Sequence, residues 1–236
     1  MSYKAIIFDM DGVIIDSKEH VEQFWRDKLE KYDIEPDGTP EELALRYHGR
    51  PARLIIDDLF EKLPESERQA LAEECAAYDA SAENYDYIPG VREVLKACLD
   101  LGLTTGLVTS ALPSKVDLML DGLGFDSPFD TTVTADRVRN GKPDPECYRL
   151  AAQELGIDPA KSIVFEDSMS GVQAASGAGA IVIGINDPEF SAVLQKSGAE
   201  LVMPDFRSVS LASESQQVTL TPLASHPETF FNIDKQ

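Results

Sequence analysis

The feature that most constrains the fold of this chain is an alternation of short apolar runs with longer amphipathic segments. From about residue 87 onward, each apolar run is followed by a helix-like segment. This order is typical of strands joined by crossover helices, and it predicts a parallel α/β sheet. The predicted strands are residues 4–10, 104–109, 129–135, 162–165, 180–185 and 200–203, and the predicted helices are residues 91–101, 115–123, 145–155, 170–178 and 189–197.

One stretch departs from this alternation. Residues 17–86 are charged, amphipathic and punctuated by proline, and we find no strand pattern there. The sequence therefore predicts an α/β core formed by residues 1–16 and 87–236, with an all-helical unit at 17–86 inserted after the first strand. The tail after about residue 207 is rich in Ser, Thr and Gln, and we predict a strand there only at 217–220. The predicted helices of the insert are residues 19–32, 40–47, 52–62 and 65–80.

Composition narrows the classes of partner. The chain has 236 residues with 42 acidic and 21 basic side chains, a formal net charge of −21. Such a surface repels nucleic acid and anionic membranes. No apolar run approaches the roughly 18 to 20 residues that span a bilayer, and the N-terminus lacks the apolar stretch of a signal peptide. We expect a cytoplasmic monomer by default, whose three cysteines are idle thiols.

Polar side chains follow three of the predicted strands. Because ligands of parallel α/β sheets bind beyond the carboxyl ends of the strands, we expect these side chains to meet at one edge. A glycine–lysine–proline segment, in a loop before a predicted helix, adds a positive charge there. The residues are Asp9 and Asp11 after the first strand, Thr109 and Ser110 after the second, Glu166 and Asp167 after the fourth, and Lys142 in the loop.

Clustered carboxylates repel one another, and burying them is costly unless a cation compensates them. All the candidate ligands are oxygens, which suits Mg²⁺. Lys142 supplies a second positive charge, so an anion site can exist on a strongly acidic protein. A metal ion and a lysine facing a carboxylate nucleophile are the groups that phosphoryl transfer requires.

Four segments resemble, in order, the four motifs of the haloacid dehalogenase superfamily. They are Phe8–Val13, Leu107–Ser110, Gly141–Pro145 and Phe165–Ser168. The resemblance covers about residues 4 to 205 and implies a Rossmann-like parallel sheet. The helical insert and the serine after Asp167 resemble the branch that contains small-metabolite phosphatases and β-phosphoglucomutases.

The resemblance implies a Mg²⁺-dependent phosphatase. Asp9 would attack phosphorus and form an aspartyl-phosphate, and Asp11 would act as general acid and then as general base. Thr109 and Lys142 would hold the phosphoryl oxygens, with help from Ser110. The helical insert would be a mobile cap that selects the leaving group. Mg²⁺ would be held by Asp9, Glu166, Asp167 and the backbone carbonyl of Asp11.

The segment His48-Gly49-Arg50 in the insert resembles a cap segment of some sugar and polyol phosphate phosphatases. We therefore predict that His48 and Arg50 contact the substrate, and that Arg50 binds its hydroxyls or a second anionic group. A surface arginine at a helix start is the alternative. The sequence does not identify the metabolite, although a sugar or polyol phosphate is favoured.

Two other functions share part of this chemistry and are the alternative hypotheses. β-Phosphoglucomutases share all four motifs but usually carry a histidine where this chain has Val21, with His20 one step earlier. A helix step of about 100° would point His20 elsewhere, so a mutase is the second hypothesis. A non-catalytic signalling receiver also phosphorylates an aspartate near Mg²⁺. Receivers are much shorter and have no cap, so this hypothesis ranks third.

Overall fold

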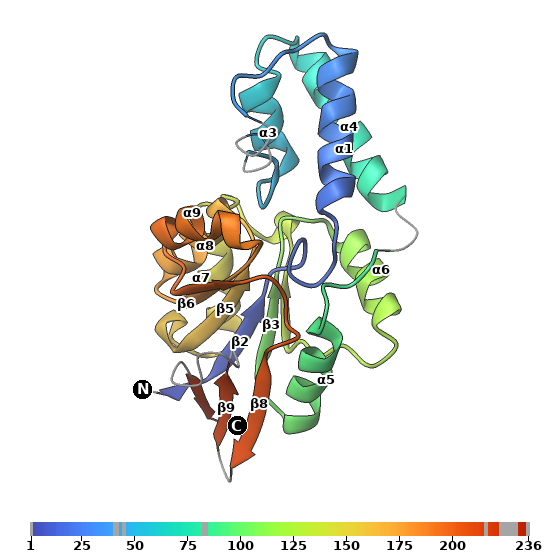
Figure 1. The fold of residues 1–236 in the computed structure, drawn as a ribbon. Helices are drawn as coiled ribbons and strands as arrows, with labels where there is room; N and C mark the ends of the chain where they lie inside the picture. Colours follow the sequence, from blue (N-terminus) through green and yellow to red (C-terminus); the bar gives the residue numbers. More distant parts are fainter. Residues whose placement is uncertain are drawn as a thin grey trace.

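The core is a six-stranded parallel sheet with the order β4-β3-β2-β5-β6-β7 (Figure 1). This computed structural model describes residues 2–39, 43, 46–81, 85–214, 217–221 and 231–234. The central strand β2 is buried on both faces, as its unbroken apolar sequence predicts. The strands are β2 (Ala5–Phe8), β3 (Thr105–Val108), β4 (Thr131–Val133), β5 (Ser162–Glu166), β6 (Ile181–Ile185) and β7 (Leu201–Met203).

Helices cover both faces of this sheet. Alternate residues of β2 point to opposite sides, so Ile6 and Phe8 pack into one apolar cluster and Ile7 into another. The first cluster contains residues of α5 (Val91–Leu101) and α6 (Pro113–Leu123). The second cluster contains residues of three further helices. These are α7 (Glu146–Glu154), α8 (Met169–Ala178) and α9 (Ser191–Ser197).

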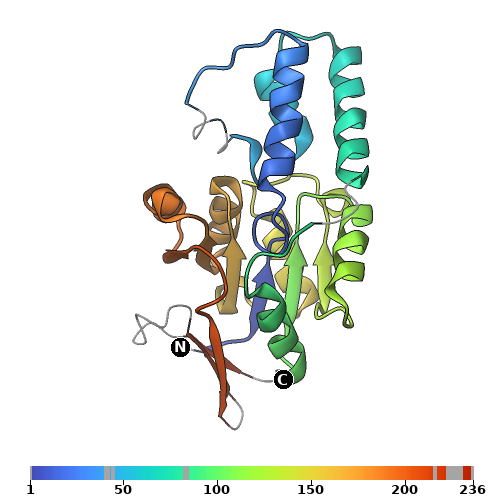
Figure 2. The same cartoon turned by 45° about the vertical axis from the view of Figure 1, so that its right-hand side comes forward.

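A separate helical unit stands above the carboxyl ends of the strands, toward which the strand arrows point (Figure 2). It contains α1 (Lys18–Lys31), α3 (Ala52–Leu59) and α4 (Glu65–Ser81), which share an apolar cluster of their own. The two connections to the core run side by side, because Ile15 pairs with Tyr87 in an antiparallel bridge. This arrangement positions the unit over the sheet edge where the predicted site lies.

A second, four-stranded sheet lies at the opposite end of the core from the helical unit (Figures 1 and 2). Of its strands the sequence predicted only β9. β1 and β10 escaped prediction because they pair with each other across almost the whole chain, which no local pattern reveals. β8 forms a local antiparallel pair with β9, but its sequence Ser-Leu-Ala-Ser-Glu lacks the β-branched and aromatic residues typical of strands. The strands, in spatial order, are β1 (Ser2–Tyr3), β10 (Phe231–Asp234), β9 (Gln217–Thr221) and β8 (Ser210–Glu214).

Most predicted elements appear within a few residues of their expected bounds. The helix predicted at 189–197 begins instead as a 3-10 turn at Pro188–Phe190, before α9. The helix predicted at 40–47 lies largely outside the described residues. Among the helices that the structure describes, none has the length and hydropathy needed to cross a membrane.

Candidate active site

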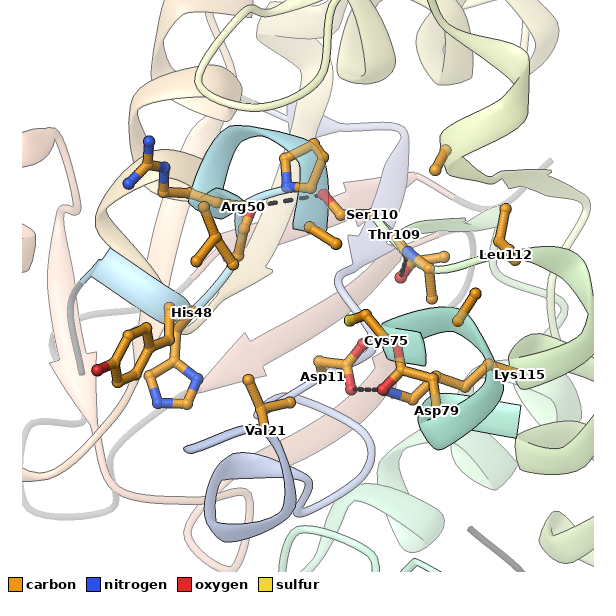
Figure 3. Close-up of a pocket in the computed structure, with 18 of the residues that line it drawn as sticks. Asp11, Val21, His48, Arg50, Cys75, Asp79, Thr109, Ser110, Leu112 and Lys115 are labelled. Carbon is orange, nitrogen blue, oxygen red and sulfur yellow. Dashed lines mark hydrogen bonds and ion pairs between the residues drawn. The ribbon is translucent and has the colours of Figure 1, made fainter. Parts of the chain in front are cut away.

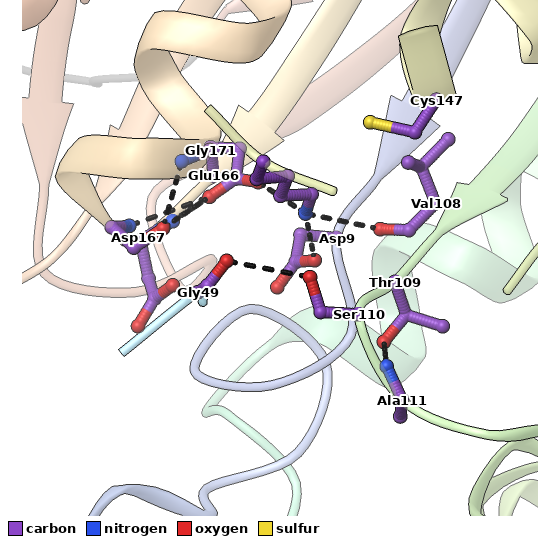
Figure 4. A network of polar contacts seen from close by, with 12 residues as sticks. Asp9, Gly49, Val108, Thr109, Ser110, Ala111, Cys147, Glu166, Asp167 and Gly171 are labelled. Atoms are coloured by element: carbon purple, nitrogen blue, oxygen red, sulfur yellow. Dashed lines mark hydrogen bonds and ion pairs between the residues drawn. The ribbon is translucent and has the colours of Figure 1, made fainter. Parts of the chain in front are cut away.

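Asp9 and Lys142 form a buried ion pair at the carboxyl edge of the sheet (Figure 4). Strand β2 ends at Phe8 and places Asp9 there. Lys142 Nζ donates to Asp9 Oδ1 at 2.5 Å and to Glu166 Oε1 at 2.6 Å. Lys142 is only 1% exposed, so both of its contacts are shielded from water. The sequence predicted that these residues meet, and the structure brings them together.

Glu166 is fully occupied by hydrogen bonds. Its Oε1 accepts from Lys142 and, at 2.7 Å, from the hydroxyl of Tyr148. Its Oε2 accepts from the backbone N–H groups of Asp167 and Ser168 and from the Ser168 hydroxyl. Any metal ligation by Glu166 therefore replaces or shares one of these contacts, because a carboxylate oxygen has two lone pairs.

The carboxylate of Asp167 is less engaged by hydrogen bonds than that of Glu166. Among the described residues, its buried Oδ1 has no hydrogen-bond partner. The side chain lies against Gly12, which has φ +73°, and a Cβ at that position would stand 2.1 Å from Asp167 Oδ2. The turn after Asp9 therefore needs a glycine both for its backbone conformation and for the close approach of Asp167.

The residues fit a divalent cation. Asp9, Glu166 and Asp167 each offer a carboxylate oxygen, and these oxygens lie within 4.8 Å of one another. An all-oxygen set with a buried, unpartnered oxygen suits Mg²⁺. One lysine among three buried carboxylates leaves a negative excess that a cation offsets. The predicted contribution of the Asp11 carbonyl stays a prediction.

Burial dominates the electrostatics of this cluster. It raises the pKa of Asp9 well above the ordinary value, against the attraction of Lys142 and with the repulsion of Glu166 and Asp167. Burial likewise raises the pKa of Asp167 to about 6, although Lys18 and His48 oppose it. Burial lowers the pKa of Lys142, but Asp9 and Glu166 reverse this, so the pKa lies above its usual range. Protonation of these carboxyl groups and binding of a cation therefore oppose each other.

Asp11 sits apart from the Lys142 pair and is held by two donors. The Ser17 hydroxyl donates to its Oδ1 at 2.5 Å, and Lys115 Nζ donates to the same atom at 2.7 Å (Figure 3). Burial would raise the pKa of Asp11, but Lys115 and the hydrogen bonds outweigh it, so the pKa is lowered. In this arrangement Asp11 is a carboxylate, the form that accepts a proton.

Thr109 and Ser110 follow β3 as predicted. The Thr109 hydroxyl accepts the backbone N–H of Ala111 at 3.0 Å, and Thr109 lines the same pocket as Asp9. The Ser110 hydroxyl donates to the backbone carbonyl of Gly49 at 3.3 Å. Ser110 therefore contacts the helical unit, while the predicted phosphate contact of its side chain stays a prediction.

The loop from His48 to Pro51 closes over the core. Gly49 has φ +68°, and a Cβ there would lie 1.9 Å from the Ser168 hydroxyl oxygen. Only a residue without a side chain allows this approach. The loop and the sheet edge enclose a cavity of about 260 Å³. Its lining includes Asp9, Asp11, Thr109 and Ser110 from the core, together with Val21, Phe24, Trp25, Tyr47, His48, Arg50, Cys75 and Asp79 from the helical unit.

The two predicted residues of the helical unit line this cavity on the side opposite Lys115 (Figure 3). His48 Nε2 lies 3.0 Å from Glu22 Oε1. The Arg50 guanidinium donates to Asp58 at 2.9 Å and to two backbone carbonyls. Arg50 is thus engaged within the helical unit, and the structure does not bring it to Asp9.

The sequence did not point to four polar residues of the site. Ser17 and Lys115 donate to Asp11, Asp79 pairs with Lys115, and Tyr148 donates to Glu166. Lys115 had a detectable signal, because it lies four residues before Met119 on the apolar face of α6. A charged residue at a core position indicates a buried partner. Nothing local marks Asp79 or Tyr148.

Comparison with known families agrees with this fold and site. The haloacid dehalogenase-like hydrolase family matches residues 6–185, which contain the whole acid cluster and the helical insert. The chain belongs to this family of hydrolases, and it is therefore an enzyme. Several of its curated relatives are named as phosphatases, which are phosphoric monoester hydrolases.

Two curated relatives and one solved structure illustrate the similarity. The chain is 35% identical to a phosphorylated carbohydrates phosphatase of Thermotoga maritima, over 86% of this chain and 95% of the relative. It is 28% identical to hexitol phosphatase A of Escherichia coli, over 91% and 96% of the two chains. A β-phosphoglucomutase structure from Clostridium difficile has a TM-score of 0.72 and 27% identity, over 86% of this chain and 91% of the other.

Proposed function

We propose that this enzyme is a Mg²⁺-dependent phosphatase of small phosphorylated metabolites, and that Asp9 carries the phosphoryl group as an aspartyl-phosphate. The single observation that carries the proposal is the position of Asp9. It is buried beside Lys142, within reach of two further carboxylates, and it faces the cavity under the helical unit. The names of the relatives favour a sugar or polyol phosphate as substrate.

The residues divide the reaction into two steps. In the first, an Asp9 carboxylate oxygen attacks phosphorus, the ester P–O bond breaks, and the leaving alcohol takes a proton from Asp11. Asp11 must therefore be protonated when the substrate is bound, although Lys115 favours its carboxylate form in the empty site. In the second, Asp11 takes a proton from water as the water oxygen attacks phosphorus, and the Asp9–phosphorus bond breaks. The products are the alcohol and inorganic phosphate, and both carboxyl groups return to their starting states.

The remaining polar groups orient the Asp9 carboxylate and neutralise charge on the phosphoryl oxygens. Lys142 fixes the Asp9 carboxylate and adds a positive charge beside the phosphoryl oxygens, and Thr109 contributes a hydroxyl at the same edge. Mg²⁺, held by Asp9, Asp167 and an exchanging Glu166, would supply further charge neutralisation. Residues 17–86 act as a cap that excludes bulk water and selects the leaving group.

The cavity favours a hydrolase over a phosphosugar mutase, although β-phosphoglucomutases share the fold. Val21 lines the cavity at the position where such mutases usually carry a histidine. His20 instead stacks on Tyr78, with ring centroids 4.1 Å apart. The cavity-lining arginine, Arg50, is engaged by Asp58, so the described lining offers no free guanidinium for a second phosphate group. A non-catalytic signalling receiver is disfavoured, because the chain belongs to a family of hydrolases.

The proposal is tested by measuring phosphate release from a panel of phosphorylated metabolites, with and without Mg²⁺. The panel includes sugar, polyol and nucleoside monophosphates and phosphoglycolate, and β-glucose 1-phosphate with a bisphosphate activator tests the mutase. We expect turnover of sugar or polyol monophosphates only with Mg²⁺. Isomerisation of glucose 1-phosphate without phosphate release would overturn the hydrolase assignment.

Asp9→Asn supplies the mechanistic control. Without the nucleophile we expect turnover to fall on the order of 10⁴-fold or more. The variant should still fold, because an amide fits the same space and can accept the hydrogen bond of Lys142. Normal turnover by Asp9→Asn, with folding verified by circular dichroism, would rule out the covalent mechanism.

A further inference from the structure

A second buried lysine, Lys115 on α6, joins the core to the helical unit. Lys115 is 3% exposed. Its Nζ lies 2.7 Å from Oδ1 of Asp11, which belongs to the core, and 3.6 Å from Oδ1 of Asp79, which lies on α4 of the helical unit. Its ammonium also stands 5.2 Å from the centroid of the Tyr85 ring, close to where the chain re-enters the core. One side chain thus contacts groups from three separate segments, of which Figure 3 shows the two that carry Asp11 and Asp79.

The contacts of Lys115 fix the direction of the Asp11 carboxylate. Ser17 and Lys115 both donate to Oδ1, so Asp11 is held by this one oxygen from two sides. Within the described part of the chain no group hydrogen-bonds Asp11 Oδ2, and Asp11 lines the cavity. Two donors on one oxygen restrict the rotation of the carboxylate, which is what a proton-transfer group needs in order to meet its substrate in one geometry.

Substrate binding is a poorer explanation of Lys115. Its single positive charge already faces two carboxylates, Asp11 and Asp79, so a third negative group there would be repelled. Asp79 lines the cavity and belongs to the helical unit, so its distance to Lys115 depends on where that unit lies. The geometry therefore links the anchoring of Asp11 to the position of α4.

We propose that Lys115 is a positioning residue that holds the Asp11 carboxylate for proton transfer, and that Asp79 couples this hold to the placement of the helical unit over the core. The inference rests on the proposed phosphatase function. It adds that a residue outside the four motifs sets the geometry of the acid–base group.

The experiment is a stopped-flow burst assay with p-nitrophenyl phosphate and Mg²⁺. In the first step the Asp9 oxygen–phosphorus bond forms and p-nitrophenolate leaves, which needs no proton. In the second step water attacks phosphorus and its proton goes to Asp11, so only this step needs a well-placed Asp11. A defect in positioning Asp11 therefore leaves the burst and slows the steady state.

For Lys115→Met we expect a burst of about one p-nitrophenol per enzyme, followed by a steady-state rate lower by on the order of 10- to 100-fold. Asp11→Asn should behave in the same way. Lys96→Met is the matched control, since Lys96 is an exposed lysine of α5 that pairs with Asp100 on the same helix, and it should behave as wild type. A wild-type steady state in Lys115→Met would overturn the proposal, and so would loss of the burst in a folded variant.

Asp79→Asn tests the coupling and keeps Lys115 in place if Lys115→Met does not fold. We expect the burst to persist and the steady-state rate to fall about two- to five-fold, as for a partly exposed ion pair. In the Lys115→Met background Asp79→Asn should add no further loss. Unchanged kinetics of Asp79→Asn, or fully additive losses in the double variant, would remove Asp79 from the mechanism. If the wild-type enzyme released neither p-nitrophenol nor phosphate from the panel, the phosphatase proposal itself would fail.

Discussion

The two buried lysines make opposite connections. Lys142 lies within the core and joins Asp9 on one strand end to Glu166 on the neighbouring one. Lys115, on α6, instead joins Asp11 of the core to Asp79 of the helical unit. Both lysines are nearly inaccessible to water and both have raised pKa values, because carboxylates outweigh the effect of burial.

The difference teaches how one site can combine rigidity with movement. The strands that hold Asp9 and Glu166 are hydrogen-bonded to each other, so the relative position of these two carboxylates is set within the core. The contact of Lys115 with Asp79 exists only when α4 is close to α6. The nucleophile is thus placed by the sheet alone, and the acid–base group by the sheet and the helical unit together.

Lys142→Met should have the largest effect and separates the two lysines most sharply. It leaves Asp9 and Glu166 buried without their cation, which typically costs about 3–5 kcal/mol of stability. We expect a markedly lower melting temperature and loss of both burst and turnover, whereas Lys115→Met keeps the burst. Urea unfolding and the burst assay measure both effects. Equal kinetic defects in the two variants would abolish the distinction.

Mg²⁺ should have an intermediate effect that depends on pH. In the metal-free protein the pKa of Asp167 is raised to about 6 and that of Asp9 is also raised, so folding favours their protonated forms. These carboxyl groups therefore destabilise the fold at pH values above the raised pKa, and the penalty shrinks as the pH falls toward the unfolded-state pKa of about 4. A cation relieves the penalty only where the groups are ionised.

We therefore expect Mg²⁺ to raise the melting temperature more at pH 7.5 than at pH 5.0. At a concentration 100 times the dissociation constant, the stabilisation is about 2.7 kcal/mol. Thermal unfolding at both pH values, with and without Mg²⁺, measures the difference, and Ca²⁺ shows whether the size of the ion matters. A shift of equal size at both pH values would mean that the metal does not bind these carboxylates.

Arg50→Ala should have the smallest effect. Since its guanidinium bonds Asp58, we expect a loss of less than about 1 kcal/mol of stability and little change in KM. Asp58→Ala is the matched variant, because it removes the carboxylate partner of Arg50 and leaves the guanidinium with only its hydrogen bonds to backbone carbonyls among the described residues. A clear rise in KM in Arg50→Ala alone would restore the substrate contact that the sequence predicted.

The sheet and the acid cluster were predictable because each is encoded locally. The apolar sequence of β2 ends at Asp9, and that of β5 ends at Glu166, so strand order alone places these carboxylates at one edge. His20 was predicted to point away from the site by helix geometry, and it stacks on Tyr78 in the helical unit.

Other features depend on contacts between distant segments, which local patterns do not encode. The Lys115–Asp79 pair, for example, forms between α6 and α4. The engagement of Arg50 by Asp58 is closer in sequence, but it depends on how the turn before α3 folds back, which no periodic pattern specifies. The parallel pairing of β1 with β10 joins Ser2 to Asn232. In each case the sequence gives the residue type but not its partner.

The pairing of β1 with β10 has a consequence for the order of folding. Closing so large a loop is entropically slow compared with forming local structure, so this ladder should be among the last parts of the native state to assemble. On a ribosome, the segments that carry Asp9, Lys142 and Asp167 would emerge long before residue 231 is synthesised. The nascent chain would then hold an assembled reaction centre before β1 can pair with β10.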